Sequence, residues 1–378
     1  MKISFVLKEK PSDIRTGVQR YYDQLVDKLG ELNELDIYYY GQISISQRSK
    51  YESKGTLTNL KSSRRSMFGS MLLRGLSDLS AIVRYDQIVH ALLPVPMKLK
   101  RGAVLVTTIH DLTPLMVPEA FPFYTPYLFK KNLKALAKSN TYFIVNSQCT
   151  GNDLQKKFSV DPSRIFHTPL GVGEEFKPAN DIVIKDVLIK YKLPQKYFLF
   201  TGAMNKRKNL DRVIEAFLLL KKNKNTDIKL VLAGRMNWGG SNIEEKVKKA
   251  GVKNDVILPG YIDEVDLPAV ISAAKAMVYV SLYEGFGFPV LEAMKCGTPV
   301  IASNTSSIPE VAGDAALLVD PLSVEAITGA MEKIEEAGEE ITDLISKGFK
   351  QAEQFTWENT ANKTIEVYKS LLQQKKKS

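Results

Sequence analysis

Short apolar strands alternate with amphipathic helices along this chain, and the alternation occurs twice. The first set of predicted strands comprises Lys2–Leu7, Leu35–Tyr40, Tyr85–Ala91, Ala103–Asp111, Thr141–Ser147 and Arg164–Gly171. The second set comprises Lys196–Ala203, Ile228–Gly234, Asp255–Tyr261, Lys275–Ser281, Thr298–Ser303 and Ala315–Asp320. Because strands that are apolar along most of their length must be covered on both faces, the pattern indicates parallel sheets between helices. The expected fold class is α/β, with two doubly wound, Rossmann-like domains.

The domain boundaries follow from the segments that interrupt or end this alternation. The helices expected in the first half lie at Val18–Leu29, Pro126–Ala137 and Gln148–Phe158. The join is expected at Gly171–Ile182, which combines glycines, acids and a proline. We therefore predict an N-terminal domain at 1–175 and a C-terminal domain at 176–356, with a final helix at about 357–378 that packs back on the first domain. The segment Ile43–Arg74 breaks the alternation, and we predict a mobile basic excursion there with a short helix near Met67–Leu76.

The net charge of +10 is concentrated in the first half of the chain. Residues 1–178 hold 25 lysines and arginines against 16 acids, a net of +9, whereas residues 179–378 hold 27 against 26. A basic half favours an anionic partner, such as a membrane surface, a lipid phosphate or nucleic acid, with charge kept for solubility as the alternative. The two cysteines lack CxxC spacing and no apolar run suits a signal peptide or a membrane span, so we expect a cytoplasmic protein.

Polar residues collect just after the predicted strands of the second domain, where parallel sheets bind their ligands. The segments are Gly202–Asn209, Gly234–Trp238, Gly260–Glu264, Tyr283–Pro289 and Asn304–Glu310. In the first of them, Lys206, Arg207 and Lys208 precede a helix, where cations neutralise a diphosphate; a solvated basic loop is the alternative. The composition of these strand ends predicts a nucleotide site.

The segment SLYEGFGFPVLEAM places Glu284 and Glu292 around a glycine-rich turn that leads into a helix. Gly285 and Gly287 allow the backbone to approach a ligand, and the amides of Phe288–Leu291 face a phosphate at the positive end of the helix. Since carboxylates accept hydrogen bonds from hydroxyls, the two glutamates suit the sugar and the ribose of a sugar nucleotide. In the alternative, Glu292 only complements the helix dipole as an acid of the first turn.

Together, several motifs resemble those of the family 4 retaining glycosyltransferases, which have the GT-B fold of two domains facing a central cleft. The motifs in the second half are Glu284-x7-Glu292, AMKCGTPVIAS, SSIPEVAGDAALLVDP and GAMNKRKNLDRVIEAF. In the first half, GVQRYYDQLVDKL and TIHDLTPLMVPEAF resemble the form found in mannosyl- and rhamnosyltransferases of surface-polysaccharide assembly. The resemblance covers nearly the whole chain.

The resemblance implies a role for each matching residue. Glu284 is expected to contact hydroxyls of the donor sugar, Glu292 to hold the ribose, Arg207 and Lys208 to clamp the diphosphate, and His110 to lie near the sugar and phosphates. Further residues implied at the donor site are Gly17, Gly202, Tyr261, Gly285, Phe286, Gly287, Phe288, Val290 and Leu291, with Ser307 and Glu310 in a segment that lines the nucleotide pocket. Residues expected on the acceptor side are His90, Asp111, Arg64 and Arg65, with Asp111 orienting its loop.

One residue departs from the family pattern. Many relatives have an arginine directly after the glycine that corresponds to Gly202, but this chain has Ala203. Neutralisation of the phosphates is then expected to rest on Arg207 and Lys208, with Lys206 as a substitute for the missing arginine.

The activity implied is transfer of a hexose, mannose first, from a GDP- or UDP-linked donor to a saccharide or lipid-linked saccharide, with retention and without a metal or other cofactor. The chain contains no DxD motif, which agrees with metal independence. The basic half is expected to contact an anionic membrane peripherally. An epimerase of the same architecture and a non-catalytic nucleotide- or anion-binding protein remain alternatives. A nucleic-acid-binding role lacks the interleaved aromatic and basic residues that it needs.

Overall fold

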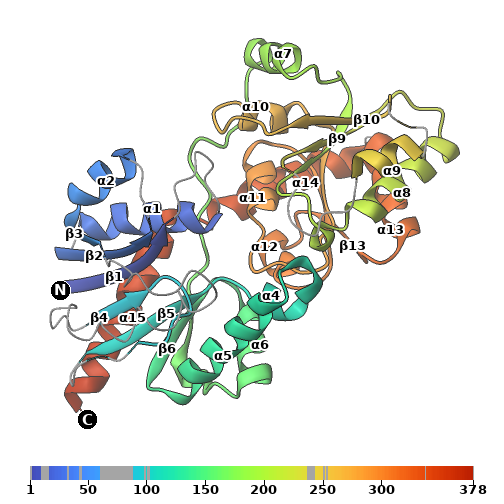
Figure 1. The fold of residues 1–378 in the computed structure, drawn as a ribbon. Coiled ribbons are helices and arrows are strands. Elements are labelled where there is room, and N and C mark those ends of the chain that lie inside the picture. Colours follow the sequence, from blue (N-terminus) through green and yellow to red (C-terminus); the bar gives the residue numbers. More distant parts are fainter. Residues whose placement is uncertain are drawn as a thin grey trace. The chain divides into compact units, whose positions relative to one another are not determined.

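A computed structural model describes residues 2–9, 17–31, 34–41, 45–59, 88–97, 99, 103–235, 243–249, 252, 254–336 and 338–377. Its contacts divide the chain into two compact units (Figure 1). The N-terminal unit comprises Met1–Leu115, Tyr124–Gly171 and Trp357–Ser378, and the C-terminal unit comprises Met116–Phe123 and Val172–Thr356. The chain therefore changes units close to the predicted join, and the grouping of Met116–Phe123 with the second unit had no signal in the sequence.

The N-terminal unit is built on a seven-stranded sheet of order β3-β2-β1-β4-β5-β6-β7. Its strands are β1 Lys2–Glu9, β2 Glu34–Gly41, β3 Gly55–Asn59, β4 Ile88–Ala91, β5 Val104–Ile109, β6 Thr141–Val145 and β7 Ile165–His167. Every neighbouring pair is parallel. All six predicted strands of this half are present, and the parallel α/β prediction is confirmed.

The seventh strand corrects the prediction for the segment Ile43–Arg74. Helix α2 (Ile45–Glu52) and strand β3 lie within it, and β3 pairs with β2 in parallel, so this part of the segment extends the sheet. The sequence hid the strand because Gly55–Asn59 is short and polar, as suits the edge of a sheet. The helix predicted near Met67–Leu76 lies outside the described residues, as do Arg64 and Arg65.

Helices cover this sheet through apolar side chains spaced for one helical face. The helices of the unit are α1 Gly17–Gly30, α2, α4 Thr113–Met116, α5 Tyr124–Lys138, α6 Gln148–Phe158 and α15 Trp357–Lys377. Leu133 and Leu136 of α5 and Leu154 of α6 join Leu105 and Phe143 of the strands in one buried core. Ser147 caps α6, accepting a hydrogen bond of 3.1 Å from the backbone amide of Thr150.

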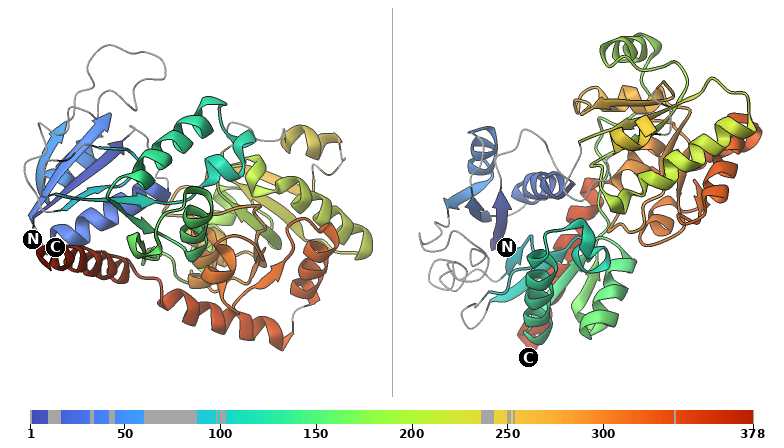
Figure 2. Two further views of the ribbon diagram at one scale, coloured as in Figure 1. Left: turned by 90° about the horizontal axis from the view of Figure 1, so that it is seen from below. Right: turned by 45° about the vertical axis from the view of Figure 1, so that its right-hand side comes forward.

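The last helix of the chain returns to the first unit. Helix α15 packs against α1, and Figure 2 shows the two running side by side. Tyr368 of α15 is fully buried in this contact region. No helix in the described part of the chain combines the length and the apolar character needed to cross a bilayer.

The C-terminal unit has a six-stranded parallel sheet of order β10-β9-β8-β11-β12-β13. Its strands are β8 Tyr197–Thr201, β9 Lys229–Ala233, β10 Val256–Gly260, β11 Ala276–Tyr279, β12 Val300–Ser303 and β13 Leu317–Val319. The helices are η3 Lys206–Lys208, α7 Asp181–Lys190, α8 Leu210–Asn223, α9 Ile243–Lys249, α10 Leu267–Ser272, α11 Phe288–Lys295, α12 Ile308–Ala312, α13 Val324–Glu336 and α14 Glu339–Glu353. Strand β8 lies between β9 and β11, so the direction of the strand order reverses between β8 and β11. Such a switch point is where open parallel sheets form a ligand crevice.

Candidate donor site

The carboxyl ends of β8, β9 and β10 are fastened to one another through their backbones. Gly202 donates to Ala233 O at 3.0 Å and Gly234 donates to Gly260 O at 2.7 Å. Gly234 has φ of 140°, and a Cβ there would lie 1.9 Å from the carbonyl oxygen of Gly202. Only glycine fits this position, so the strand ends form a closely packed rim of backbone.

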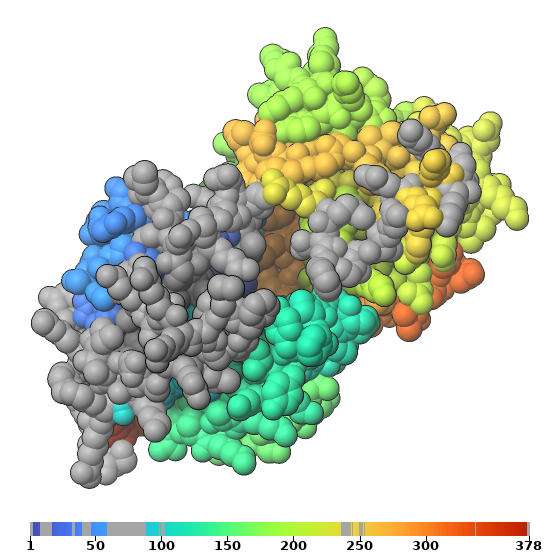
Figure 3. Space-filling model, viewed as in Figure 1, coloured from blue at the N-terminus to red at the C-terminus, as the bar shows by residue number. Residues whose placement is uncertain are grey.

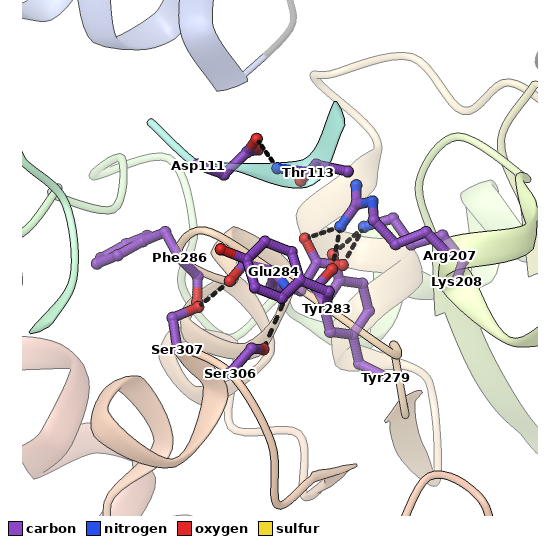
Figure 4. A network of polar contacts seen from close by, with 10 residues as sticks. All are labelled: Asp111, Thr113, Arg207, Lys208, Tyr279, Tyr283, Glu284, Phe286, Ser306 and Ser307. Atoms are coloured by element: carbon purple, nitrogen blue, oxygen red, sulfur yellow. Dashed lines mark hydrogen bonds and ion pairs between the residues drawn. The ribbon is translucent and has the colours of Figure 1, made fainter. Parts of the chain in front are cut away.

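Next to this rim, three ionised side chains meet at the switch point. Arg207 and Lys208 follow β8 on the short helix η3, and Glu284 follows β11. The carboxylate of Glu284 accepts from the Lys208 ammonium at 2.7 Å and from Nη1 of Arg207 (Figure 4). The side chains of Lys208 and Glu284 are 8% and 9% exposed, so the ion pairs are nearly desolvated. Two cations against one carboxylate leave a net charge of +1 in a buried site.

Backbone contacts hold η3 against the end of β11. The amide of Leu282 donates to Arg207 O at 2.8 Å, and Arg207 Nη1 donates to Tyr283 O at 2.7 Å. The side chain of Asn209, which has φ of 59°, donates to Val280 O at 3.1 Å. These contacts place the cations independently of the ion pairs with Glu284.

Electrostatics keep Glu284 ionised although it is buried. Burial alone raises the pKa of this carboxyl, but the charges and hydrogen bonds of Arg207 and Lys208 outweigh it and lower the pKa to about 2. Tyr279 lies beside Lys208 and Glu284. The Lys208 ammonium donates to the Tyr279 hydroxyl and lies 4.5 Å from the centroid of the tyrosine ring. Burial and the nearby Glu284 charge raise the pKa of Tyr279 well above its usual value, so the hydroxyl stays protonated.

The glycine-rich turn after Glu284 is held by the segment that follows β12. The amide of Glu284 donates to Ser306 Oγ at 3.0 Å, and the single hydroxyl proton of Ser307 is shared between the carbonyls of Glu284 and Phe286, whose oxygens lie 3.0 and 2.8 Å from Oγ (Figure 4). Gly287 has φ of 123°, and a Cβ there would lie 2.7 Å from Ile308 Cδ1. The turn is thus fixed by two hydroxyls and by close packing, whereas the sequence predicted only that its glycines allow the backbone to approach a ligand.

Helix α11 begins at Phe288, as the proline after it favours. Of the amides expected to face a phosphate, that of Val290 already donates to Gly287 O at 3.0 Å. Glu292 is buried and is the fifth residue of the helix, so the alternative of a first-turn acid does not describe its position. The side chains of Val290 and Leu291 are fully buried, which leaves only their backbone for contact with a ligand.

The other predicted donor-site residues differ in their surroundings. Gly285 is buried, and the ring of Phe286 packs on Phe288 and Phe355, so its side chain serves the fold. Tyr261 follows β10, and its ring centroid lies 5.2 Å from the guanidinium carbon of Arg235, which belongs to the predicted strand-end segment Gly234–Trp238. Lys206 is exposed, Glu310 is partly buried on α12, and Gly17 is the first residue of α1.

In the N-terminal unit, His110 directly follows β5. The Asn146 side-chain amide donates to its Nδ1 at 2.9 Å, and the Tyr21 ring packs edge-on with centroids 5.0 Å apart. Burial lowers the pKa of His110 to about 4, against an opposing effect of the Leu92 backbone, so the ring is neutral near pH 7. Asp111 accepts from the Thr113 amide at 2.8 Å and so shapes the start of α4 (Figure 4).

His90 does not face an acceptor, which corrects the prediction. Its side chain is fully buried, its Nδ1 lies 2.6 Å from the Tyr368 hydroxyl, and its Nε2 lies 2.7 Å from Thr108 Oγ1. Burial, with a smaller contribution from His110, lowers the pKa of His90 to about 3. The sequence could not reveal this because Tyr368 is 278 residues away along the chain.

The sequence analysis did not identify Tyr279, and it named the segments that contain Ser306 and Arg235 without giving either residue a role. The only signal for Tyr279 was a hydroxyl-bearing residue at the carboxyl end of an otherwise apolar strand. Within the described residues, no three His, Cys, Asp or Glu side chains gather as a metal site requires.

Two protein-family models match the chain. The model described as Glycosyltransferase Family 4 matches residues 15–176, and the model described as Glycosyl transferases group 1 matches residues 188–351. Among curated proteins, the O-antigen chain mannosyltransferase B of Escherichia coli is 32% identical over 375 residues, covering 94% of this chain and 96% of the relative.

Solved structures with the same fold include WaaG and Anabaena HepE. WaaG, a glycosyltransferase involved in lipopolysaccharide biosynthesis, superposes with a TM-score of 0.76 at 17% identity and covers 97% of this chain and 99% of WaaG. Anabaena HepE in complex with UDP-glucose gives a TM-score of 0.75 at 15% identity, covering 98% and 100%. These likenesses confirm the predicted GT-B fold.

Proposed function

The chain belongs to the family 4 glycosyltransferases, and from this premise we propose that it transfers mannose from GDP-mannose to a saccharide or lipid-linked saccharide, with retention. The name of the Escherichia coli relative supports both mannose and polysaccharide assembly. The complex of HepE with UDP-glucose supports a nucleoside-diphosphate sugar as the donor class, with UDP as the second candidate for the nucleotide.

The observation that carries the proposal is the buried cluster of Arg207, Lys208 and Glu284 at the switch point of the second sheet. A departing nucleoside diphosphate gains negative charge as its bond to the sugar breaks. Cations already fixed in a desolvated site stabilise that charge without reorganising, which is commonly the largest catalytic effect. The excess of one positive charge in the cluster therefore suits a diphosphate leaving group.

The carboxylate of Glu284 forms ion pairs with both Arg207 and Lys208. When the diphosphate takes its place beside Arg207 and Lys208, Glu284 is released to accept hydrogen bonds from hydroxyls of the donor sugar. As a carboxylate, Glu284 has only acceptor oxygens, which suits it to receive hydrogen bonds from sugar hydroxyls. We propose that Glu292 holds the ribose and that His110, which burial keeps neutral, contacts the sugar and phosphates of the donor.

In the proposed reaction, the bond from the anomeric carbon to the diphosphate oxygen breaks while the acceptor oxygen bonds to that carbon on the same face. The acceptor's proton passes to an oxygen of the departing phosphate, so charge and atoms balance without an enzyme-bound sugar. Arg207 and Lys208 supply the positive charge that a metal ion would otherwise bring, and we therefore propose metal-independent transfer.

The test is donor binding and turnover by the purified chain. GDP, UDP and their sugars are compared by thermal shift, since a ligand that binds the native state raises stability once its concentration exceeds Kd. Lys208→Met is expected to abolish most of the shift, and Lys196→Met, which removes an exposed lysine of the same unit, is expected to leave it unchanged. We expect EDTA to leave the rate of transfer unchanged. We also expect NMR to show the same anomeric configuration in the product as in the donor.

Three results would contradict the proposal. Absence of any nucleotide shift would favour a non-catalytic anion-binding protein, and isomerisation of the donor without an acceptor would favour the epimerase. An inverted anomeric configuration in the product would rule out retention.

We also propose peripheral contact with an anionic membrane, where a lipid-linked acceptor would lie. Helix α5 supports this because it contains no acidic residue and exposes Lys130, Lys131, Lys134 and Lys138. Its first turn exposes Tyr124 and Tyr127 at 51% and 68%, and Figure 3 shows α5 in teal at the surface. Lysines near an anionic leaflet contribute roughly 1 kcal/mol each.

Sedimentation with phosphatidylglycerol vesicles at low salt tests the membrane contact. Replacing Lys130 and Lys134 by glutamate is expected to release the protein, whereas the same change at Lys185 and Lys192, exposed in the other unit, is the control. Failure of the unaltered protein to sediment with these vesicles would exclude the contact.

A further inference from the structure

We propose that Tyr279 is a positioning residue that holds the Lys208 ammonium in place for the donor diphosphate, an inference that rests on the proposed function. Tyr279 is the last residue of β11 and is 2% exposed. Its hydroxyl bonds to Lys208 Nζ, and the same ammonium lies 4.5 Å from the centroid of its ring. Tyr279 itself has no assigned contact with the donor.

Tyr279 and Glu284 share the donors of the Lys208 ammonium. An ammonium has three N–H groups, and one is directed to the Tyr279 hydroxyl while another is directed to Glu284 Oε1 at 2.7 Å. Glu284 is an anion, so it competes with a diphosphate for the lysine. Tyr279 is neutral, because burial and the charge of Glu284 both raise its pKa, and it does not compete. The tyrosine hydroxyl is therefore the partner that Lys208 keeps when a diphosphate displaces Glu284.

The tyrosine is fixed more firmly than the lysine that it contacts. Its strand pairs with β8 and β12, and its ring stacks on that of Phe200, which is fully buried, with centroids 6.1 Å apart and planes at 14°. Lys208 instead reaches the site on a flexible side chain from the short helix η3. Because the lysine has the greater freedom, the tyrosine determines where the ammonium lies.

The first test compares Tyr279→Phe with Tyr197→Phe in titrations with GDP and with guanosine. Tyr279→Phe keeps the ring, its stacking and its contact with the ammonium, but removes the hydroxyl. We expect the Kd for GDP to rise about tenfold, as for loss of a hydrogen bond to a charged group, and the Kd for guanosine, which lacks phosphate, to stay within about twofold. Tyr197 is a matched control because it is also fully buried in this sheet and donates to Val270 O at 2.6 Å.

The second test is a double-mutant cycle with Lys208→Met. If Tyr279 acts through the lysine, Tyr279→Phe adds no further loss of GDP affinity once Lys208 is absent. The proposal would be overturned if Tyr279→Phe reduced GDP affinity equally with and without Lys208, or if it reduced the affinity for guanosine as well. Either result would indicate a general structural effect. An unchanged GDP affinity in Tyr279→Phe would overturn it as well.

The same cycle separates failure of this inference from failure of the proposed function. If Lys208→Met itself leaves the Kd for GDP unchanged, the lysine does not bind the diphosphate, and the proposed site is wrong. If Lys208→Met weakens GDP binding and Tyr279→Phe does not, only the positioning role is wrong. Thermal unfolding verifies that each variant is folded, and Tyr279→Met, which fills the space flexibly and also lacks the hydroxyl, replaces the phenylalanine variant if that variant does not fold.

Discussion

Replacement of Glu284 by glutamine is expected to destabilise the chain in a way that depends on pH. The pKa of this carboxyl falls from an ordinary 4.5 to about 2 in the folded protein. A difference of about 2.5 pKa units corresponds to about 3 kcal/mol of stability at neutral pH, at about 1.36 kcal/mol for each unit. That value agrees with the roughly 3–5 kcal/mol lost when a buried ion pair loses one partner.

The direction of the pH dependence follows from the lowered pKa. The contribution of Glu284 is complete above pH 4.5 and is lost as the pH falls toward 2, because the unfolded chain then binds the proton first. By pH 3 about 2 kcal/mol of the contribution is lost, so the gap in stability between the unaltered chain and Glu284→Gln narrows by that amount.

Urea unfolding of both proteins at a series of pH values between 7 and 3 measures this gap. Glu215→Gln, which alters an exposed glutamate on α8, is the control and is expected to show no gap at any pH. If the difference in unfolding free energy between the unaltered chain and Glu284→Gln stays constant from neutral to acid pH, the reasoning is refuted. Such a result would mean that Arg207 and Lys208 do not lower the pKa of Glu284.

Three further substitutions test the packing around the site and in the first unit. Gly234→Ala is expected to reduce the free energy of unfolding by about 2 kcal/mol or more, and so to lower Tm in differential scanning calorimetry, because its Cβ would lie 1.9 Å from the carbonyl oxygen of Gly202. An unchanged Tm would show that the rim is not rigid. Ser307→Ala removes the hydroxyl whose single proton is shared between two carbonyls of the turn after Glu284. The change is expected to cost about 1–2 kcal/mol in urea unfolding and to weaken GDP binding, and normal binding would count against the role of the turn. Tyr368→Phe leaves His90 Nδ1 without its partner and is expected to reduce the free energy of unfolding by about 1–3 kcal/mol and to speed hydrogen exchange in α15. Unaltered exchange would argue that the His90–Tyr368 hydrogen bond does not hold α15 in place.

Most of the fold was predictable because it depends on local patterns. Apolar runs and helical periodicity located all twelve predicted strands, and the parallel arrangement followed from strands that are apolar on both faces. Strand β3 escaped prediction because Gly55–Asn59 is short and polar and so contains no apolar run. The segment Met116–Phe123 escaped because its grouping with the second unit depends on contacts far along the chain.

The candidate site was predictable in its residue types but not in its contacts. The sequence alone determined that cations and carboxylates follow the strands of the second half, since a strand end and the residues after it are neighbours in the chain. Only the tertiary structure decided that β8 lies beside β11, which brings Lys208 to Glu284 and Tyr279 across 76 and 71 residues. The same kind of long-range packing buried His90 against Tyr368 and so removed it from the candidate site. Local periodicity specifies strands and helices, whereas the order of strands in a sheet depends on the free energy of the whole packed core, and that order determines which charges meet.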